Sequence, residues 1–429
     1  MNTPMPVILI CTVGGSHQPI LTAIRDAAPD YVCFLCTGKD AASGQAGSDV
    51  QILGKGNFIK ARWDDEKPTL PNIPTQAGLR AEQFEVVLIA ADDLDESFTA
   101  IRLTLANLAR RFPQGRFLAD YTGGTKTMTA ALVTAALEDD AVELQLVTGS
   151  RVDLVKVRSG METTLAANVE RIRLQRAMAA HVASWQRYAY AEAAQGLESL
   201  KMPRDRHGAA TLQRLRDLSR AFDAWDRFDH ATAYGLLDAY RPRIGHALAL
   251  HLNTLKGLLQ DSPKQEPLRL LDLWRNAQRR AAQGRYDDAV ARVYRLLEWS
   301  AQWLLKRHCG IDTGHIAPEQ APPGIELTTT REGKLQAGLF AAWELVGRLV
   351  EGPAQLFIRE QRNRLQDRIK VRNQSILAHG FTPIRAADWE AMADWIGGPV
   401  LKMLLDEMAD WSVKLPPQLP TAPDWETEI

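Results

Sequence analysis

A change of pattern near residue 158 constrains the fold of this 429-residue chain more than any other feature. Before it, short β-rich runs alternate with helical runs, which is typical of a parallel sheet covered by helices. From about Leu165 onward the strands stop and amphipathic helices follow, with Ala289, Val293 and Leu296 at helical spacing. We therefore expect an α/β N-terminal domain with a mainly parallel sheet, followed by an all-α region.

Four predicted strands in the first part each run into a polar or glycine-rich loop. The strands are Val7 to Cys11, Tyr31 to Cys36, Val86 to Ala91 and Arg116 to Ala119. The loop residues that we single out are Thr12, Gly14, Gly15, Ser16, Gly38, Lys39, Asp92, Thr122, Gly123, Gly124, Thr125 and Lys126. In a parallel open sheet such loops meet at the carboxyl edge, where ligands bind. Turn formation alone explains one such loop, but four together favour a ligand site.

The last of these loops has the features of a phosphate site. A short strand leads into a Gly-Gly turn with hydroxyls and a lysine, and an apolar helical stretch follows from Met128 to Leu137. This order offers backbone N–H groups and the positive end of a helix dipole to an anion. The loop is not a Walker A motif, because no lysine directly follows its glycines. Hydrolysis of nucleoside triphosphates is therefore disfavoured.

A second chemical motif lies near the other end, at Arg372, Asn373 and His379, and it ends in Gly380. If this segment is helical, Arg372 and His379 return to one face after two turns, while Ile376 and Leu377 point away from it and bury. Arginine matches a phosphate with planar donors, and histidine can move a proton near neutral pH. Together they suit phosphodiester cleavage without a metal. Taken alone, the motif fits a solvated helix face equally well.

The two motifs together resemble a known architecture. Thr-Val-Gly-Gly-Ser after the first strand and Asp-Tyr-Thr-Gly-Gly-Thr-Lys-Thr-Met later resemble CARF domains, and Arg372, Asn373 and His379 resemble the HEPN ribonuclease signature. The whole chain is similar to CARF–HEPN ribonucleases of type III CRISPR systems. The resemblance implies a Rossmann-like CARF domain at residues 1–160, a helical linker domain at 161–264 and a helical HEPN domain at 265–429.

The resemblance also implies an activity. The CARF loops would bind cyclic tetra- or hexa-adenylate as an allosteric activator, with no other cofactor, and the HEPN domain would cut single-stranded RNA in antiviral defence. Arg372, Asn373 and His379 would be catalytic, and both domains would pair in a homodimer. Some CARF domains slowly cleave their own ring, so Thr12 and Ser16 either assist such cleavage or only bind the ring and shape the loop.

A different class of function is also open. Residues 224–231 and 282–289 resemble helical hairpins of tetratricopeptide repeats, although their aromatic residues Phe228 and Tyr286 are too far apart for that repeat. The chain would then be a nucleotide-sensing module whose helical half recruits a partner and cuts nothing.

Composition limits partners and location. A net charge of −1 argues against a wholly basic surface, so RNA contact should be local, near the cationic run from Arg359 to Arg372. No segment is apolar enough to cross a bilayer and no signal peptide is evident, which predicts a cytoplasmic protein. Cys33 and Cys36 should lie on opposite faces of one strand as core residues. No clustered histidine pattern suggests a metal site.

Overall fold

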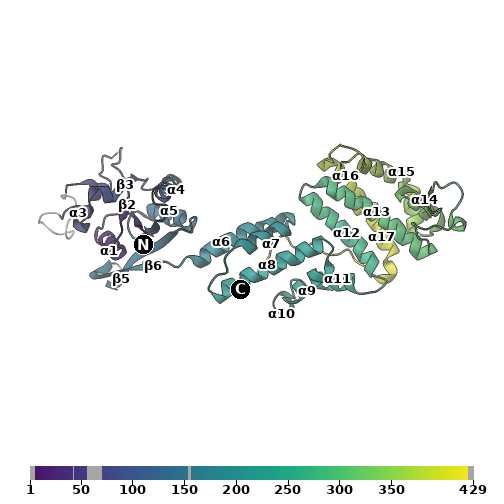
Figure 1. The fold of residues 1–429 in the computed structure, drawn as a ribbon, viewed down its shortest axis with the longest axis horizontal. Coiled ribbons are helices and arrows are strands. Elements are labelled where there is room, and N and C mark those ends of the chain that lie inside the picture. Colours follow the sequence, from purple (N-terminus) through teal and green to yellow (C-terminus); the bar gives the residue numbers. More distant parts are fainter. Residues whose placement is uncertain (1–4, 42, 56–69, 153–155, 424–429) are drawn as a thin grey trace. The chain divides into compact units, whose positions relative to one another are not determined.

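A computed structural model describes residues 5–41, 43–55, 70–152 and 156–423 (Figure 1). The chain forms two compact units, Met1–Arg176 and Ala177–Ile429. The described residues of the first unit form a sheet with its helices, and those of the second are almost entirely helical. The predicted order of an α/β domain followed by an all-α region is therefore confirmed.

The first unit is built on a six-stranded sheet in the order β3-β2-β1-β4-β5-β6. Its strands are β1 (Val7–Thr12), β2 (Tyr31–Cys36), β3 (Phe84–Leu88), β4 (Arg116–Asp120), β5 (Val142–Val152) and β6 (Lys156–Ala166). The first five run parallel, and β6 runs antiparallel to β5. The strand order reverses between β1 and β4. In an open α/β sheet this switch point is where the ends of neighbouring strands leave room for a ligand.

Helices cover the sheet on both faces. They are α1 (Gln18–Ala27), α2 (Val50–Leu53), α3 (Ile73–Ala77), α4 (Leu94–Arg111) and α5 (Lys126–Leu137). Ile8 and Ile10 pack into the apolar cluster that contains α4 and α5 residues, whereas Leu9 and Cys11 pack into the cluster that contains α1 residues. Burial on both faces explains why β1 and β2 read as continuous apolar runs rather than as alternating patterns.

The two cysteines of β2 belong to the core, as predicted. Cys33 and Cys36 are fully buried and belong to the clusters on opposite faces of the sheet. Burial raises the pKa of both thiols, to about 12 for Cys36. The neutral thiols act as small apolar side chains.

An antiparallel hairpin of β5 and β6 closes the sheet. β5 extends to Val152, which pairs with Lys156, so Gly149 lies inside the strand at a register shift and not at the turn. Residues 153–155 lie outside the described part of the chain. The predicted domain end at residue 160 falls within β6, and the α/β unit continues to Arg176.

The second unit begins within α6 (Glu170–Val182) and consists of packed helices. They are α7 (Tyr190–Ser199), α8 (Arg206–Asp226), α9 (His230–Asp238), α10 (Arg241–Ile244), α11 (Ala249–Leu259), α12 (Gln265–Ala282), α13 (Tyr286–Cys309), α14 (Leu339–Leu349), α15 (Pro353–Asn373), α16 (Ala386–Trp395) and α17 (Leu401–Glu407). A two-stranded ribbon joins β7 (Thr328–Thr329) to β8 (Leu335–Gln336). The predicted apolar stripe of α13 is buried from Ala289 to Leu304, and this helix packs against α12, α14 and α15.

Two helical hairpins repeat within this unit, α8 with α9 and α12 with α13. Each first helix ends in a turn whose second residue has a left-handed backbone, Phe228 at φ 65° and Gly284 at φ 72°. The structural equivalent of Phe228 is thus Gly284, and Tyr286 corresponds to His230, the first residue of α9. The sequence alignment of residues 224–231 with 282–289, which pairs Phe228 with Tyr286, is therefore off by two residues.

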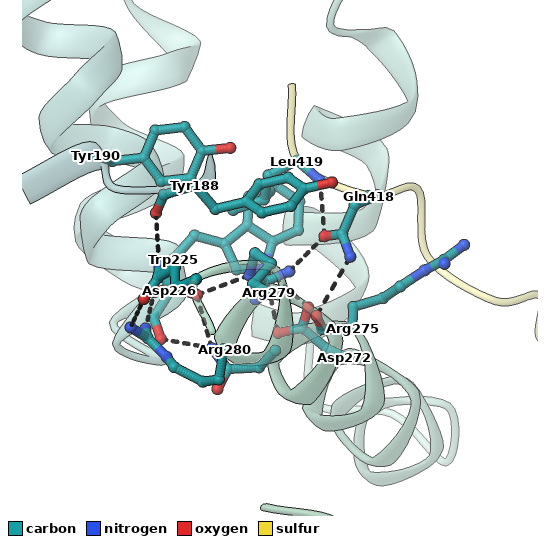
Figure 2. Close-up of polar contacts among 12 residues, drawn as sticks. Tyr188, Tyr190, Trp225, Asp226, Asp272, Arg275, Arg279, Arg280, Gln418 and Leu419 are labelled. Atoms are coloured by element: carbon teal, nitrogen blue, oxygen red, sulfur yellow. Dashed lines mark hydrogen bonds and ion pairs between the residues drawn. The ribbon is translucent and has the colours of Figure 1, made fainter. Parts of the chain in front are cut away.

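A buried polar cluster joins these hairpins (Figure 2). The carboxylate of Asp226, at the end of α8, accepts hydrogen bonds from Arg279 Nε at 2.7 Å and from Asn276 Nδ2 at 2.8 Å, and it also pairs with Arg280. Arg279 is fully buried. Removing one partner of a buried ion pair is strongly destabilising, so this cluster ties α8 to α12.

The C-terminal segment lies across the same cluster. Gln418 accepts from Arg279 Nη1 at 2.9 Å (Figure 2). The carbonyl of Pro416 accepts from Arg275 Nε at 2.8 Å. Leu419 is buried among residues of α8, α9 and α11. The C-terminal segment therefore packs against α8, α9 and α11 and is also hydrogen-bonded to α12. The division into a linker at 161–264 and a HEPN domain at 265–429, which meets the loop between α11 and α12, remains a proposal.

Candidate ligand edge and candidate nuclease motif

The loops after β1 and β4 pack directly against each other at the switch point of the sheet. Thr12 Oγ1 donates to the carbonyl of Gly123 at 2.6 Å. A Cβ on Gly14 would lie 2.6 Å from the backbone nitrogen of Gly124, and one on Gly123 would lie 2.4 Å from the carbonyl oxygen of Thr12. Only residues without a side chain permit this approach, so the glycines bring the two loops into one structure.

The loop after β3 joins the same edge through Thr125. Its hydroxyl donates to the carbonyl of Ala91 at 2.5 Å and accepts from the backbone nitrogen of Met128 at 3.2 Å, which caps α5. Asp92 follows Ala91 and is exposed. Gly124 has φ +84°, a left-handed conformation that lets the chain turn into this helix.

The loop after β2 is held by residues that sequence reasoning missed. The backbone nitrogen of Thr37 donates to Ser48 Oγ at 3.0 Å, and Gln51 donates to the carbonyl of Gly14. Gly38 lies next to the side chain of Leu88 at the end of β3. Ser48 and Gln51 carry no recognisable motif, because their role depends only on where the chain returns.

Apart from the half-buried glycines Gly14, Gly38, Gly123 and Gly124, the predicted ligand residues fall into two groups. Thr12, Thr122 and Thr125 use their hydroxyls inside the protein, and Thr122 Oγ1 accepts from the backbone of Val147 at 2.6 Å. The exposed members of the edge are Gly15, Ser16, Lys39, Asp92 and Lys126. The threonines thus shape the edge, and the exposed side chains are free to meet a ligand.

The electrostatics of the edge favour an anion near α5. Lys126 is the first residue of this helix, and its ammonium has no ion-pair partner among the described residues. The Asp120 carboxyl below the Gly-Gly turn is buried, and burial raises its pKa against the hydrogen bonds from Thr122 and Gln145. The helix dipole and the lysine at the first position of α5 make this end of the edge electropositive.

The nuclease motif differs from the sequence prediction. Helix α15 ends at Asn373, so Arg372 and His379 do not share a helix face. Instead Ser375 donates its backbone N–H to Arg372 O, and Gly380 donates to Ser375 O. Ile376 and Leu377 are 63% and 49% exposed rather than buried. The close return of Gly380, where a Cβ would lie 2.0 Å from Gln374 O, explains why the helix gives way to a turn here.

The turn nevertheless brings the three predicted catalytic residues together. Arg372 Nη1 donates to Asn373 Oδ1 at 3.2 Å, and the backbone N–H of His379 donates to the carbonyl of Asn373 at 3.3 Å. Asn373 and His379 are exposed. Asn373 therefore links the cation of the motif to the segment that carries its histidine.

One neighbour of the motif was not predicted. The guanidinium carbon of Arg372 lies 4.2 Å from the centroid of the Tyr294 ring, on α13. Tyr294 is far from the motif in sequence and lies in an amphipathic helix, where an aromatic residue is expected to belong to the core. No sequence signal could have identified it.

Comparisons with known proteins bear on the fold and on the C-terminal domain. Residues 259–399 match the family model of the Csm6 HEPN domain, and this region of the chain is therefore a HEPN domain of the Csm6 type. Csm6 from Enterococcus italicus, bound to cyclic hexa-2'-fluoro-hexa-dAMP, has a similar structure, with a TM-score of 0.54 and 14% identity over 95% of each chain. The predicted fold, an α/β sheet domain followed by a helical region that contains a HEPN domain, is thus confirmed.

Other comparisons add little. Can2 from Sulfobacillus thermosulfidooxidans, in complex with cyclic tetra-adenylate, matches with a TM-score of 0.24 and 12% identity over 56% of this chain and 69% of that one, which is too low to bear on the fold. No curated protein matches this chain in sequence.

Two further observations concern metals and membranes. Within residues 5–41, 43–55, 70–152 and 156–423, no group of three or more His, Cys, Asp or Glu side chains could hold a metal ion. Over the same ranges no helix is both long and apolar enough to span a bilayer.

Proposed function

We propose that this chain is a metal-independent, single-strand endoribonuclease of CRISPR antiviral defence that acts in the cytoplasm and is activated by a cyclic oligoadenylate. The observation that carries the proposal is the exposed turn that unites Arg372, Asn373 and His379 inside the region matched by the Csm6 HEPN model. A cation and a titratable imidazole at one exposed position can act on a phosphodiester, and they need no metal to do so.

In the proposed reaction the 2′-hydroxyl of a ribose attacks the adjacent phosphorus, and the bond from phosphorus to the 5′-oxygen breaks. One proton leaves the attacking hydroxyl and one is needed by the departing oxygen. His379 takes the proton from the attacking hydroxyl and then gives one to the departing oxygen, while Arg372 stabilises the charge that builds on the phosphoryl oxygens. Asn373 holds the other two in place, which its contacts with both support.

Activation would take place at the edge formed by the CARF loops. A cyclic tetra- or hexa-adenylate carries phosphates that suit Lys126, Lys39 and the amides of the two glycine turns. The similar Csm6 structure holds a cyclic hexanucleotide analogue, which supports a ring as the ligand. Asp92, being exposed and acidic, is better suited to a ribose hydroxyl or an adenine amino group than to a phosphate.

The surface around the motif supports a homodimer. Ile376, Leu377 and Phe381 are exposed, and Phe381 is 90% exposed, although all three are large and apolar. Apolar side chains grouped around a polar motif suit a protein interface better than free solvent. A second copy of the chain would cover them and face its own motif across a two-fold axis, which gives one composite cleft.

Single-stranded RNA would reach this cleft along α15. Arg359 and Arg364 of this helix are exposed and have no ion-pair partner among the described residues. Unpaired arginines attract a phosphate backbone without selecting a sequence. This agrees with a local basic surface on a chain whose net charge is −1.

The competing function is a nucleotide sensor that recruits a partner through its helical half. The observation in its favour is the pair of equivalent hairpins, α8 with α9 and α12 with α13. Stacked helical hairpins form binding surfaces in repeat proteins. The two proposals differ in one respect that is simple to measure, namely whether RNA is cut.

The test uses the purified full chain with a fluorogenic single-stranded RNA in the presence of EDTA. Cyclic tetra-adenylate and cyclic hexa-adenylate are each added, with linear oligoadenylate as the control. We expect cleavage with one ring and none with the linear control. If neither ring produces cleavage although one of them binds, the nuclease proposal fails and the recruiting module is favoured.

A further inference from the structure

The contact between Arg372 and Tyr294 is the most specific feature that the proposed function does not use. The guanidinium lies over the ring at 4.2 Å, and the ring packs against the core of the helical unit. Tyr294 belongs to α13, which is anchored along its length by buried apolar residues. The ring is therefore a fixed surface, and a planar cation stacks well on it.

The hydrogen bonds of Arg372 show what the ring contributes. Nε is buried and has no hydrogen-bond partner among the described residues, so no acceptor holds that side of the group. Nη1 donates to Asn373. Nη2 has no partner within the described part of the chain and is not among its buried unpaired atoms. The ring of Tyr294 thus holds the guanidinium in place of a hydrogen bond at Nε. The Nη2 donor, which lies in the plane of the group, remains available to a substrate.

We propose that Tyr294 is a positioning residue of the ribonuclease site, which holds the Arg372 guanidinium so that Nη2 can meet the scissile phosphate. The inference rests on the proposed function. An arginine side chain without such a support samples many rotamers, and catalysis by charge stabilisation depends on donors that are already in place. Loss of the ring should therefore slow the chemical step more than it weakens RNA binding.

Helix α15, which carries Arg372, also provides a matched control. Arg362 of α15 lies over Phe340, with its guanidinium carbon 5.1 Å from the ring centroid, and it also pairs with Glu344. Phe340→Leu removes an aromatic ring of similar size and burial that faces an arginine outside the motif. Any general cost of losing such a contact in this domain will appear in that variant.

The experiment compares Tyr294→Phe, Tyr294→Leu and Phe340→Leu in RNA cleavage at saturating activator. A cation–π contact of about 1–2 kcal/mol corresponds to roughly a tenfold change in rate. We expect Tyr294→Leu to lower kcat by about that factor, with KM for RNA and the half-maximal activator concentration unchanged. Tyr294→Phe keeps the ring and should rescue kcat. Tyr294→Met is a second aliphatic variant in case thermal unfolding shows that Tyr294→Leu is unstable.

Two kinetic outcomes would overturn the inference. One is an effect of Tyr294→Leu no larger than that of Phe340→Leu. The other is an equal loss in Tyr294→Phe, which would assign the role to the hydroxyl.

A spectroscopic measurement separates this inference from the proposed function. In protein labelled with nitrogen-15 arginine, the Nε–H signal that disappears in Arg372→Lys belongs to Arg372. Its proton should lie upfield because of the ring above it, and Tyr294→Leu should move it downfield. If the wild type cuts no RNA, the proposed function fails while this signal still decides the contact. An unshifted Arg372 signal refutes the positioning role.

Discussion

The ligand edge and the nuclease motif differ in how their polar residues are held and covered. At the edge, the loops after β1 and β4 are joined by backbone contacts so close that glycine is required, and side-chain hydrogen bonds attach the loops after β2 and β3. The threonine hydroxyls are used internally. At the motif, one exposed turn carries the polar residues and is flanked by uncovered apolar side chains. The loops of the edge are held together by contacts within a single chain. The motif lacks a cover, which is why we expect it to function only in a dimer.

The contrast also concerns what fixes each charged group. Lys126 is placed by the start of a capped helix and has no protein partner among the described residues, so its charge remains available to a ligand. Arg372 is held by a ring and by Asn373. A sensor benefits from a cation that its ligand completes, whereas a catalyst benefits from a cation that is already positioned.

The largest expected effect comes from the motif. His379→Ala should lower RNA cleavage by about 10²–10⁴-fold, which is the usual contribution of general acid–base catalysis. Activator binding, measured by calorimetry, should not change. His315→Ala is the matched control, because this exposed histidine in the same unit only pairs with Asp312. Near wild-type cleavage by His379→Ala under EDTA would show that the reaction takes place elsewhere.

The next effect tests the edge. Lys126→Ala removes one charge-assisted hydrogen bond to the ring, worth about 1.5–3 kcal/mol, so the half-maximal activator concentration should rise by about one to two decades. Maximal cleavage at saturation should stay the same, because the nuclease motif is unchanged. Arg25→Ala, which removes an exposed cation from the last turn of α1, should leave the curve in place. If the Lys126→Ala curve also stays in place, Lys126 does not contact the ligand.

A smaller effect tests whether the edge needs its close packing. Gly14→Ala places a Cβ 2.6 Å from Gly124 N and should cost about 1–3 kcal/mol of stability, with a matching rise in activator requirement. Gly15→Ala adds a Cβ that meets nothing within 4 Å, so its thermal unfolding should match the wild type. Equal unfolding temperatures for the two variants would mean that the two loops move apart to accommodate the added Cβ without loss of stability.

The sequence predicted the parts of this molecule that depend on local pattern. Apolar runs buried on both sides identified β1 and β2, and glycines after strands identified the edge. It failed where the chain turns back on itself. The seven-residue spacing of Arg372 and His379 fits a helix, yet the close return of Gly380 to Gln374 ends it. The contact of Arg372 with Tyr294 lay beyond reach, because it depends on how α13 and α15 pack.

The smallest expected effect concerns cleavage of the activator ring by the edge itself. Thr12 is fully buried and its hydroxyl proton is donated to Gly123, so it holds the loop and is poorly placed to act on a ligand. Ser16, four residues further along the chain, is exposed. If the edge aligns a 2′-hydroxyl of the ring for in-line attack, slow opening should depend on Ser16 and Lys126.

The measurement follows the ring by chromatography over hours with excess protein. Linear products should persist in His379→Ala and fall several-fold in Ser16→Ala, whereas Thr12→Ser, which keeps the hydroxyl, should retain them. Loss of products in His379→Ala would move ring opening to the nuclease motif. A ring that stays intact in the wild type would show that the exposed lysine and serine bind it without aligning it for attack. The edge would then be a sensor only, and another enzyme would have to end the signal.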